Sequence, residues 1–165
     1  MTEKRKRALM WTLYALLFLL TMLLQGTVLG HLPILGVRCV PLPLLFACAA
    51  VWTGAEDGAV YALLAGAFYA LTGAADGPIL LVTGALCAAV SGYACEVFFT
   101  RRLFSGLLFG LAGLLLTLAA FYLSRLYFDG GGAAVLLSAL RQFLVTAPLC
   151  LPMYFLCKWI RKVGP

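Results

Sequence analysis

One stretch of the chain constrains its fold more than any other. Between Ala8 and Val37 the sequence contains no Asp, Glu, Lys or Arg. A helix needs about 20 apolar residues to cross the hydrocarbon core of a bilayer, and a buried helix of a soluble protein does not need a charge-free run of this length. The run therefore predicts a transmembrane segment. We interpret Lys4 to Arg7, just before it, as the flank of an uncleaved signal anchor, because no small-residue cleavage site follows.

The rest of the chain has the same character. Of its 165 residues, 64% are hydrophobic and 11% are charged, whereas a soluble domain is nearer half apolar and a quarter charged. We therefore expect residues 1–165 to form a single transmembrane domain, an all-α integral membrane bundle of six helices, with five helices as the alternative. The predicted helices cover residues 8–29, 40–53, 58–75, 78–100, 103–122 and 138–157.

Glycine and proline mark the breaks between these helices. Gly30 and Pro33 end the first helix, because glycine frees the backbone and proline cannot continue a helix. Helix 40–53 is shorter than a bilayer core and has Pro41 and Pro43 at its start, where a missing amide donor costs little. Residues 133–140 precede Arg141, and this stretch could span the membrane, lie flat in the interface or re-enter it.

The basic residues predict an orientation. Cytoplasmic ends of membrane proteins carry an excess of Lys and Arg. Six helices place nine basic residues on the side of both termini, Lys4, Arg5, Lys6, Arg7, Arg101, Arg102, Lys158, Arg161 and Lys162, and three on the other side, Arg38, Arg125 and Arg141. Five helices would divide them equally, so six are preferred. The net charge of +6 lies beside apolar runs, which favours anionic lipid headgroups over nucleic acid as its partner.

The sequence offers few groups for catalysis or metal binding. The one histidine, His31, lies in a loop, and the six cysteines have no C-x-x-C spacing. Glu96 is the one acid inside a predicted span, where it suits an ion pair at headgroup level or with a neighbouring helix. Arg141 suits either a partner contact or snorkelling to the surface. We therefore expect no enzyme, no cofactor and no metal.

Small residues recur at helical spacing and predict close contacts between helices. They are Gly58, Ala62, Gly66 and Ala70 on one helix, and Gly106 and Gly110 on another. Packing inside the bundle is favoured over a dimer face, because six helices must pack against one another. We expect helices 58–75 and 103–122 to be central for this reason.

The first helix and the loop after it carry a family resemblance. Residues 24–29 read LQGTVL and residues 32–38 read LPILGVR. This order resembles the "LQ-x-TVL … LP-x-LGV" run of the rod shape-determining protein MreD family, and the likeness extends over essentially the whole chain. Gly54 with Gly58-Ala59, and Gly92-Tyr93 before residues 101–104, resemble later family features. Cys39-Val40-Pro41 stand where family members often have Pro-Asp after the LGV run, and Ala70 stands where an Asp is common.

The resemblance implies a non-enzymatic membrane scaffold of the bacterial cell-elongation machinery. Such a scaffold lies in the cytoplasmic membrane, binds the anchored protein MreC and other elongation-complex proteins, and helps couple MreB filaments to peptidoglycan synthesis and rod shape. It would use the outer segment and the inner loop for partner contacts. The candidate residues are Gln25, Leu32, Pro33, Gly36, Arg38, Arg101 and Arg102.

A different class remains as the alternative, a substrate-binding membrane subunit of an energy-coupling-factor-type vitamin transporter. MreD-like chains resemble such subunits in size and in their six-span layout. A binding subunit needs polar or aromatic groups that converge on an outer cavity. The candidates for this role are too scattered along the sequence to predict such a cavity: Gln25, Trp52, Tyr69, Tyr122 and Arg141.

Overall fold

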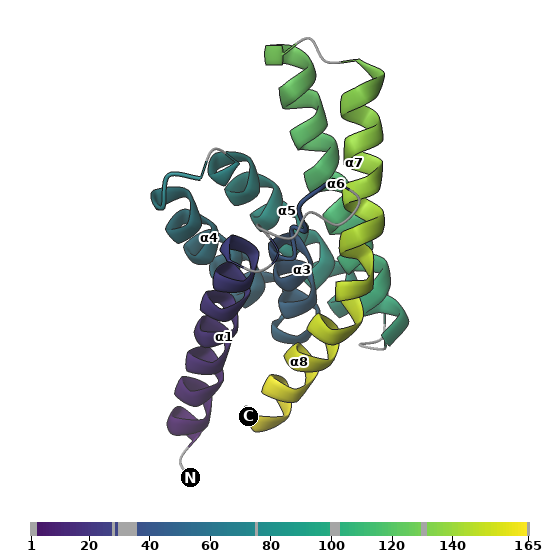
Figure 1. Ribbon diagram of the computed structural model, residues 1–165. Helices are drawn as coiled ribbons and strands as arrows, with labels where there is room; N and C mark the ends of the chain where they lie inside the picture. The colour runs from purple at the N-terminus through teal and green to yellow at the C-terminus, as the bar shows by residue number, and fades with distance from the viewer. Residues whose placement is uncertain are drawn as a thin grey trace.

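The computed structural model describes residues 3–27, 29, 36–74, 76–99, 103–129 and 132–164, and these ranges contain helices and no strand. In chain order the helices are α1 (Glu3–Gly26), α3 (Leu42–Thr53), α4 (Ala55–Leu71), α5 (Gly77–Val97), α6 (Leu103–Asp129), α7 (Ala133–Thr146), the 3₁₀ turn η1 (Ala147–Leu149) and α8 (Cys150–Val163). Figure 1 shows their arrangement.

The last three elements form one bent rod, Ala133–Val163. Pro148 lies in η1 and Pro152 near the start of α8. Proline has no amide donor for the α-helical ladder, and a short 3₁₀ turn accommodates the gap. The rod changes direction at this point (Figure 1). With this rod counted once, the described part of the chain has six helical rods, so the predicted number of six is confirmed.

Four of the described rods are long and apolar enough to cross a membrane, judged by length and composition. They are Glu3–Gly26, Gly77–Val97, Leu103–Phe128 and Ala133–Val163. Their flanks expose large apolar side chains, for example Leu16 and Leu123 at 60% and 62%. Exposed apolar patches of this kind mark surfaces that contact lipid or another protein.

The centre of the molecule is α3, which is only 12 residues long. Every residue from Leu44 to Val51 is 0% exposed, and α3 contacts α4, α5, α6 and α8. A helix that is apolar on all sides lies in a core or spans a membrane, and α3 is too short to span one. The expectation that helices 58–75 and 103–122 would be central is therefore wrong, because α3 is covered on all sides, whereas α4 exposes Leu64 and α6 exposes Leu123.

Small residues make the helix contacts close. A Cβ added at Gly58 would lie 2.5 Å from the Ala50 Cβ of α3, and one added at Gly66 would lie 3.0 Å from the Leu81 Cα of α5. A Cβ added at Gly77 of α5 would lie 2.6 Å from the Ala70 Cα of α4. Helices α4 and α5 thus pack backbone to backbone, the approach that small residues allow.

The other small residues are buried at similar contacts. Ala62 is 0% exposed. A side chain added at Gly106 would meet the Tyr154 ring, and one added at Gly110 would lie 2.5 Å from the Cys150 sulfur. The pair on α6 therefore faces α8, inside the same chain.

Several helices have other ends than those expected. Helix α1 begins at Glu3 instead of residue 8, because lysine and arginine extend a helix well. Helix α4 begins at Ala55, so Glu56 and Asp57 form its first turn instead of a loop, where acids interact favourably with the helix dipole. Helix α6 continues to Asp129. The stretch 133–140 is helical and continuous with the rest of its rod.

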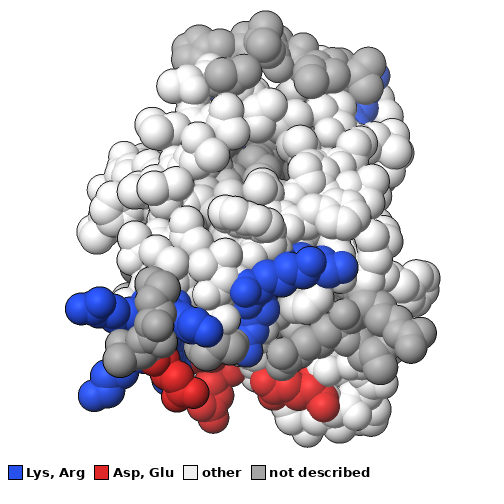
Figure 2. All heavy atoms as spheres, turned by 90° about the horizontal axis from the view of Figure 1, so that it is seen from below, with Lys and Arg blue, Asp and Glu red and all other residues white. Residues whose placement is uncertain are grey.

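The two termini lie at the same end of the bundle, here called the terminal end, and the α6–α7 connection lies at the opposite, far end (Figure 1). Figure 2 views the molecule from the terminal end, where basic and acidic side chains gather over one part of the face. Helices α6 and α7 extend beyond the other helices at the far end (Figure 1).

Candidate functional site

A cavity of about 710 Å³ lies at the far end of the bundle. Its walls come from five parts of the chain: the end of α1, residues 36–40, the region of the turn between α4 and α5, the last part of α6, and α7. We call it the far-end cavity. Its volume falls within the range of about 300–1,000 Å³ that is usual for small-molecule sites.

Gln25 and Tyr69 form one wall of this cavity. Gln25 lies in the last turn of α1, and its Nε2 donates a hydrogen bond to the Tyr69 Oη of α4 at 3.1 Å. The Gln25 Oε1 is buried and has no hydrogen-bond partner among the described residues. An unpaired buried acceptor costs about 1–3 kcal/mol. This wall therefore contains a buried acceptor that the described residues leave unsatisfied.

The segment that carries Arg38 is fastened to α7. Gln142 Nε2 donates to the Arg38 carbonyl oxygen at 3.0 Å, and the Val40 amide donates to Thr146 Oγ1 at 3.3 Å. Cys39 between them is 2% exposed, and burial raises the pKa of its thiol. The backbone of the segment is thus held, while the Arg38 side chain remains exposed at the cavity.

Three charged residues line the cavity: Arg38, Asp76 and Arg125. All three have exposed side chains. Asp76 directly precedes α5, and Arg125 lies in the last part of α6. A smaller pocket of about 30 Å³ shares Asp76, Arg125, Ser138 and Gln142 with the cavity. The polar surface therefore continues between α6 and α7.

The structure brings together some of the residues that the sequence singled out. Gln25, Gly36 and Arg38 all line the far-end cavity. Leu32, Pro33, Arg101 and Arg102 lie outside the described residues. The structure also adds Asp76, Arg125, Ser138 and Gln142, which were not expected to act together. What these four residues share in the sequence is a polar side chain near one end of an apolar helix, and these helix ends lie on the same side of the bundle.

The residues considered as candidates for a substrate-binding subunit lie in different parts of the structure. Gln25 and Tyr69 are bonded to each other at the cavity, and Tyr122 lines the smaller pocket. Trp52 instead packs against Tyr154, with ring centroids 5.6 Å apart. Arg141 is exposed and is not among the described residues that line the cavity. The cavity therefore exists, and part of this set contributes to it.

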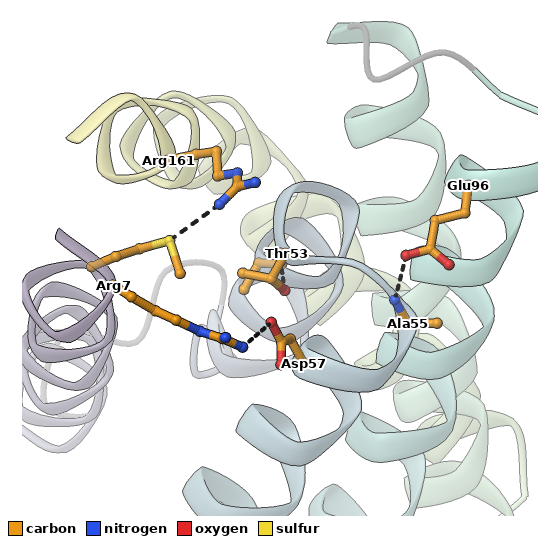
Figure 3. Close-up of polar contacts among 8 residues, drawn as sticks. Arg7, Thr53, Ala55, Asp57, Glu96 and Arg161 are labelled. Carbon is orange, nitrogen blue, oxygen red and sulfur yellow. Dashed lines mark hydrogen bonds and ion pairs between the residues drawn. The ribbon is translucent and has the colours of Figure 1, made fainter. Parts of the chain in front are cut away.

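The terminal end has a different kind of polar contact (Figure 3). Arg7 Nη2 and Asp57 Oδ2 form an ion pair at 3.5 Å between α1 and α4. Glu96 Oε1 accepts a hydrogen bond from the Ala55 amide at 3.2 Å, so this acid of α5 satisfies the first turn of α4. Arg161 Nη1 donates to the Met10 sulfur at 3.5 Å. These contacts join helices at the surface and do not enclose a cavity.

An apolar groove runs between α1 and α4. It has a volume of about 490 Å³, and the residues that line it include Trp11, Phe18, Tyr61, Leu64 and Phe68. The Arg7–Asp57 ion pair lies on its terminal side and the Gln25–Tyr69 hydrogen bond on its far side. Tyr61 also donates to the Tyr14 carbonyl oxygen at 3.0 Å. The groove is thus a surface depression between two helices that side chains hold together.

Metal-binding side chains do not gather anywhere in the described ranges, where no group of three or more His, Cys, Asp or Glu residues could hold an ion. The far-end cavity is therefore the candidate functional site. Comparison of the chain with protein-family models, with curated proteins and with solved structures finds no match.

Proposed function

We propose that the chain is a multi-pass protein of the bacterial cytoplasmic membrane, with both termini in the cytoplasm. The placement of both termini and of Lys4 to Arg7, Lys158, Arg161 and Lys162 at one end of the bundle supports this orientation (Figures 1 and 2), since cytoplasmic ends are rich in basic residues. The apolar flanks of the four long helices support insertion into lipid. In this orientation the far-end cavity opens on the outer surface.

Within that membrane the chain acts as a non-enzymatic scaffold of the cell-elongation machinery. It binds MreC and helps couple MreB filaments to peptidoglycan synthesis. The support is the resemblance of residues 24–38 to the MreD run, together with the position of Gln25, Gly36 and Arg38 in one outer cavity. The cytoplasmic loop with Arg101 and Arg102 faces the cytoskeleton or anionic lipid.

Affinity purification of the tagged chain from native membranes, in mild detergent and with mass spectrometry, tests this proposal. Recovery of MreC with peptidoglycan synthases is expected. Charge reversal at Arg101 and Arg102 should weaken the cytoplasmic contacts. Unchanged complex assembly and unchanged topology in that variant would refute the role of this loop.

One observation favours a second candidate, a substrate-binding subunit of an energy-coupling-factor-type transporter. The far-end cavity gathers polar groups from several helices, which is the arrangement that a binding subunit needs. The same purification separates the two functions. Recovery of an ATPase and a coupling subunit, without MreC, would replace the scaffold by the transporter subunit.

A further inference from the structure

Two residues that line the far-end cavity carry hydrogen-bond acceptors, Gln25 and Asp76. Gln25 Oε1 is buried without a hydrogen-bond partner among the described residues, while its Nε2 is already used by Tyr69. The Asp76 carboxylate lines the same cavity and can only accept hydrogen bonds when it is ionised. A molecule that satisfies this part of the cavity must therefore carry hydrogen-bond donors, such as hydroxyl or ammonium groups.

The cavity also presents two guanidinium groups. Arg38 and Arg125 line it from different parts of the chain, one before α3 and one in α6. The Arg125 side chain is exposed, so it is free to turn toward a ligand. The planar fork of arginine matches the oxygens of phosphate, often through two parallel hydrogen bonds. Two arginines against one carboxylate leave a net positive charge, which favours an anionic group in the ligand.

The position of the cavity along the membrane normal also favours a phosphate-containing ligand. Helix α1 has 24 residues, about the length that crosses a bilayer. Gln25 is in its last turn, so the cavity lies near the level of the lipid headgroups on the far side. Phosphodiesters of the bilayer are concentrated at this level, beside the cavity that Gln25 and the two arginines line.

We propose that the far-end cavity binds a phosphodiester whose alcohol part carries a hydrogen-bond donor. Arg38 and Arg125 hold the phosphate oxygens, and Gln25 Oε1 and Asp76 accept from the hydroxyl or ammonium group. The donor and the phosphate are both needed, because both acceptors and guanidinium groups line the cavity, with Asp76 and Arg125 also sharing the smaller pocket beside it. This binding does not depend on whether the chain contacts MreC or a transporter.

Two sources can supply this chemistry, a membrane phospholipid and a free glycerophosphodiester. Native mass spectrometry of the full chain, reconstituted with equal amounts of phosphatidylglycerol, phosphatidylethanolamine and phosphatidylcholine, tests the first source. Phosphatidylcholine is the matched control, because it has the phosphodiester but no donor. A thermal-shift titration with glycerophosphoglycerol and glycerophosphoethanolamine tests the second.

The wild-type chain should retain the two donor-bearing lipids at least tenfold better than phosphatidylcholine, or should be stabilised by the free diesters in the thermal-shift titration. Arg125→Gln should lower this binding about tenfold, whereas Arg141→Gln, at the same end but outside the cavity lining, should leave it unchanged. Gln25→Leu should reduce the preference for the donor-bearing lipids over phosphatidylcholine. It changes no charge, so it tests the proposal if Arg125→Gln does not fold.

Equal retention of all three lipids by the wild type, with no shift from the free diesters, would overturn the proposal. Equal effects of Arg125→Gln and Arg141→Gln would do so as well. MreC recovery with the Arg125→Gln variant, measured in parallel, shows whether the scaffold function fails or survives independently of ligand binding.

Discussion

The centre of the bundle and its far end are built in opposite ways. In α3 every residue from Leu44 to Val51 is fully buried, and the neighbouring helices approach it through glycine and alanine. At the far end the helices diverge around a cavity of about 710 Å³ lined by charged and amide side chains. The centre is closely packed. The far end contains a buried acceptor, Gln25 Oε1, without a partner among the described residues.

This difference indicates which region stabilises the fold and which region is suited to binding. Helix packing in a membrane depends on close van der Waals contact and on interhelical hydrogen bonds. The contacts around α3 supply the first, because this central apolar helix touches five others, α1, α4, α5, α6 and α8. Polar groups at the far end contribute little to packing, and their arrangement is instead suited to binding. Substitutions should therefore separate the two regions by the size of their effect on stability.

The largest effect should come from opening a cavity in the centre. Leu44→Ala in α3, at 0% exposure, should lower the free energy of unfolding by about 2–5 kcal/mol, as expected for a buried leucine that leaves a void. Leu137→Ala on α7, at 48% exposure, should change it by less than about 0.5 kcal/mol. Unfolding in a titration with SDS, followed by tryptophan fluorescence, measures both. Equal losses would show that α3 is not the packed centre.

A smaller loss should follow from adding volume where helices touch. A Cβ at Gly92 would lie 2.6 Å from the Ala55 Cα, a backbone atom that cannot turn aside. Gly92→Ala should therefore cost about 1–3 kcal/mol, the usual range for overpacking. Gly132 has nothing within 4 Å of its added Cβ, so Gly132→Ala is the matched control. Thermal unfolding in detergent compares the two, and a lower melting temperature for the control alone would contradict this account.

The sequence predicted the helices of this chain better than their arrangement. Long apolar runs bounded by glycine and proline indicate helices by local rules, so the number of six was predictable. Which helix lies at the centre depends on all the others. The regular spacing of Gly58 and Gly66 favoured helix 58–75, whereas the central position belongs to α3, whose short apolar run has no polar face to expose.

The candidate site was predictable only in part. Gln25, Gly36 and Arg38 were singled out on family resemblance, and they share one cavity. Asp76 and Arg125 are far apart in the chain, and each alone suits a solvated residue at a helix end.

The contact of Glu96 at the terminal end was also predicted only in part. The sequence predicted an ion pair or a headgroup contact, whereas Glu96 accepts a hydrogen bond from the Ala55 amide, next to the corner at Gly54, which has a φ of 105°. Such pairings depend on how helices cross, and spacing along the chain does not determine that.

The far end should tolerate loss of its polar groups better than the centre tolerates the truncation of Leu44 to alanine. In the double variant Gln25→Leu with Tyr69→Phe, both partners of the 3.1 Å hydrogen bond are replaced by apolar groups of similar size. This change should alter the free energy of unfolding by less than about 1 kcal/mol, since removal of both partners leaves nothing unpaired. Thermal unfolding in lipid-free detergent measures it. Tyr69→Phe alone should cost more than the double variant, and a larger loss in the double variant would mean that this wall stabilises the fold.

The smallest effect should come from the terminal end, where Arg7 and Asp57 pair at 3.5 Å with side chains 63% and 43% exposed. Exposed ion pairs contribute about 0–1 kcal/mol, and salt screens them further. Arg7→Glu should therefore lower the free energy of unfolding by less than about 1 kcal/mol at low salt, and by less still at high salt. The exchange of both charges, Arg7→Glu with Asp57→Arg, should restore it, whereas Lys6→Glu is the control for net charge alone. A loss as large as that of Leu44→Ala, or one that salt does not reduce, would mean that this contact belongs to the packed region, and the contrast between the centre and the ends of the bundle would not hold.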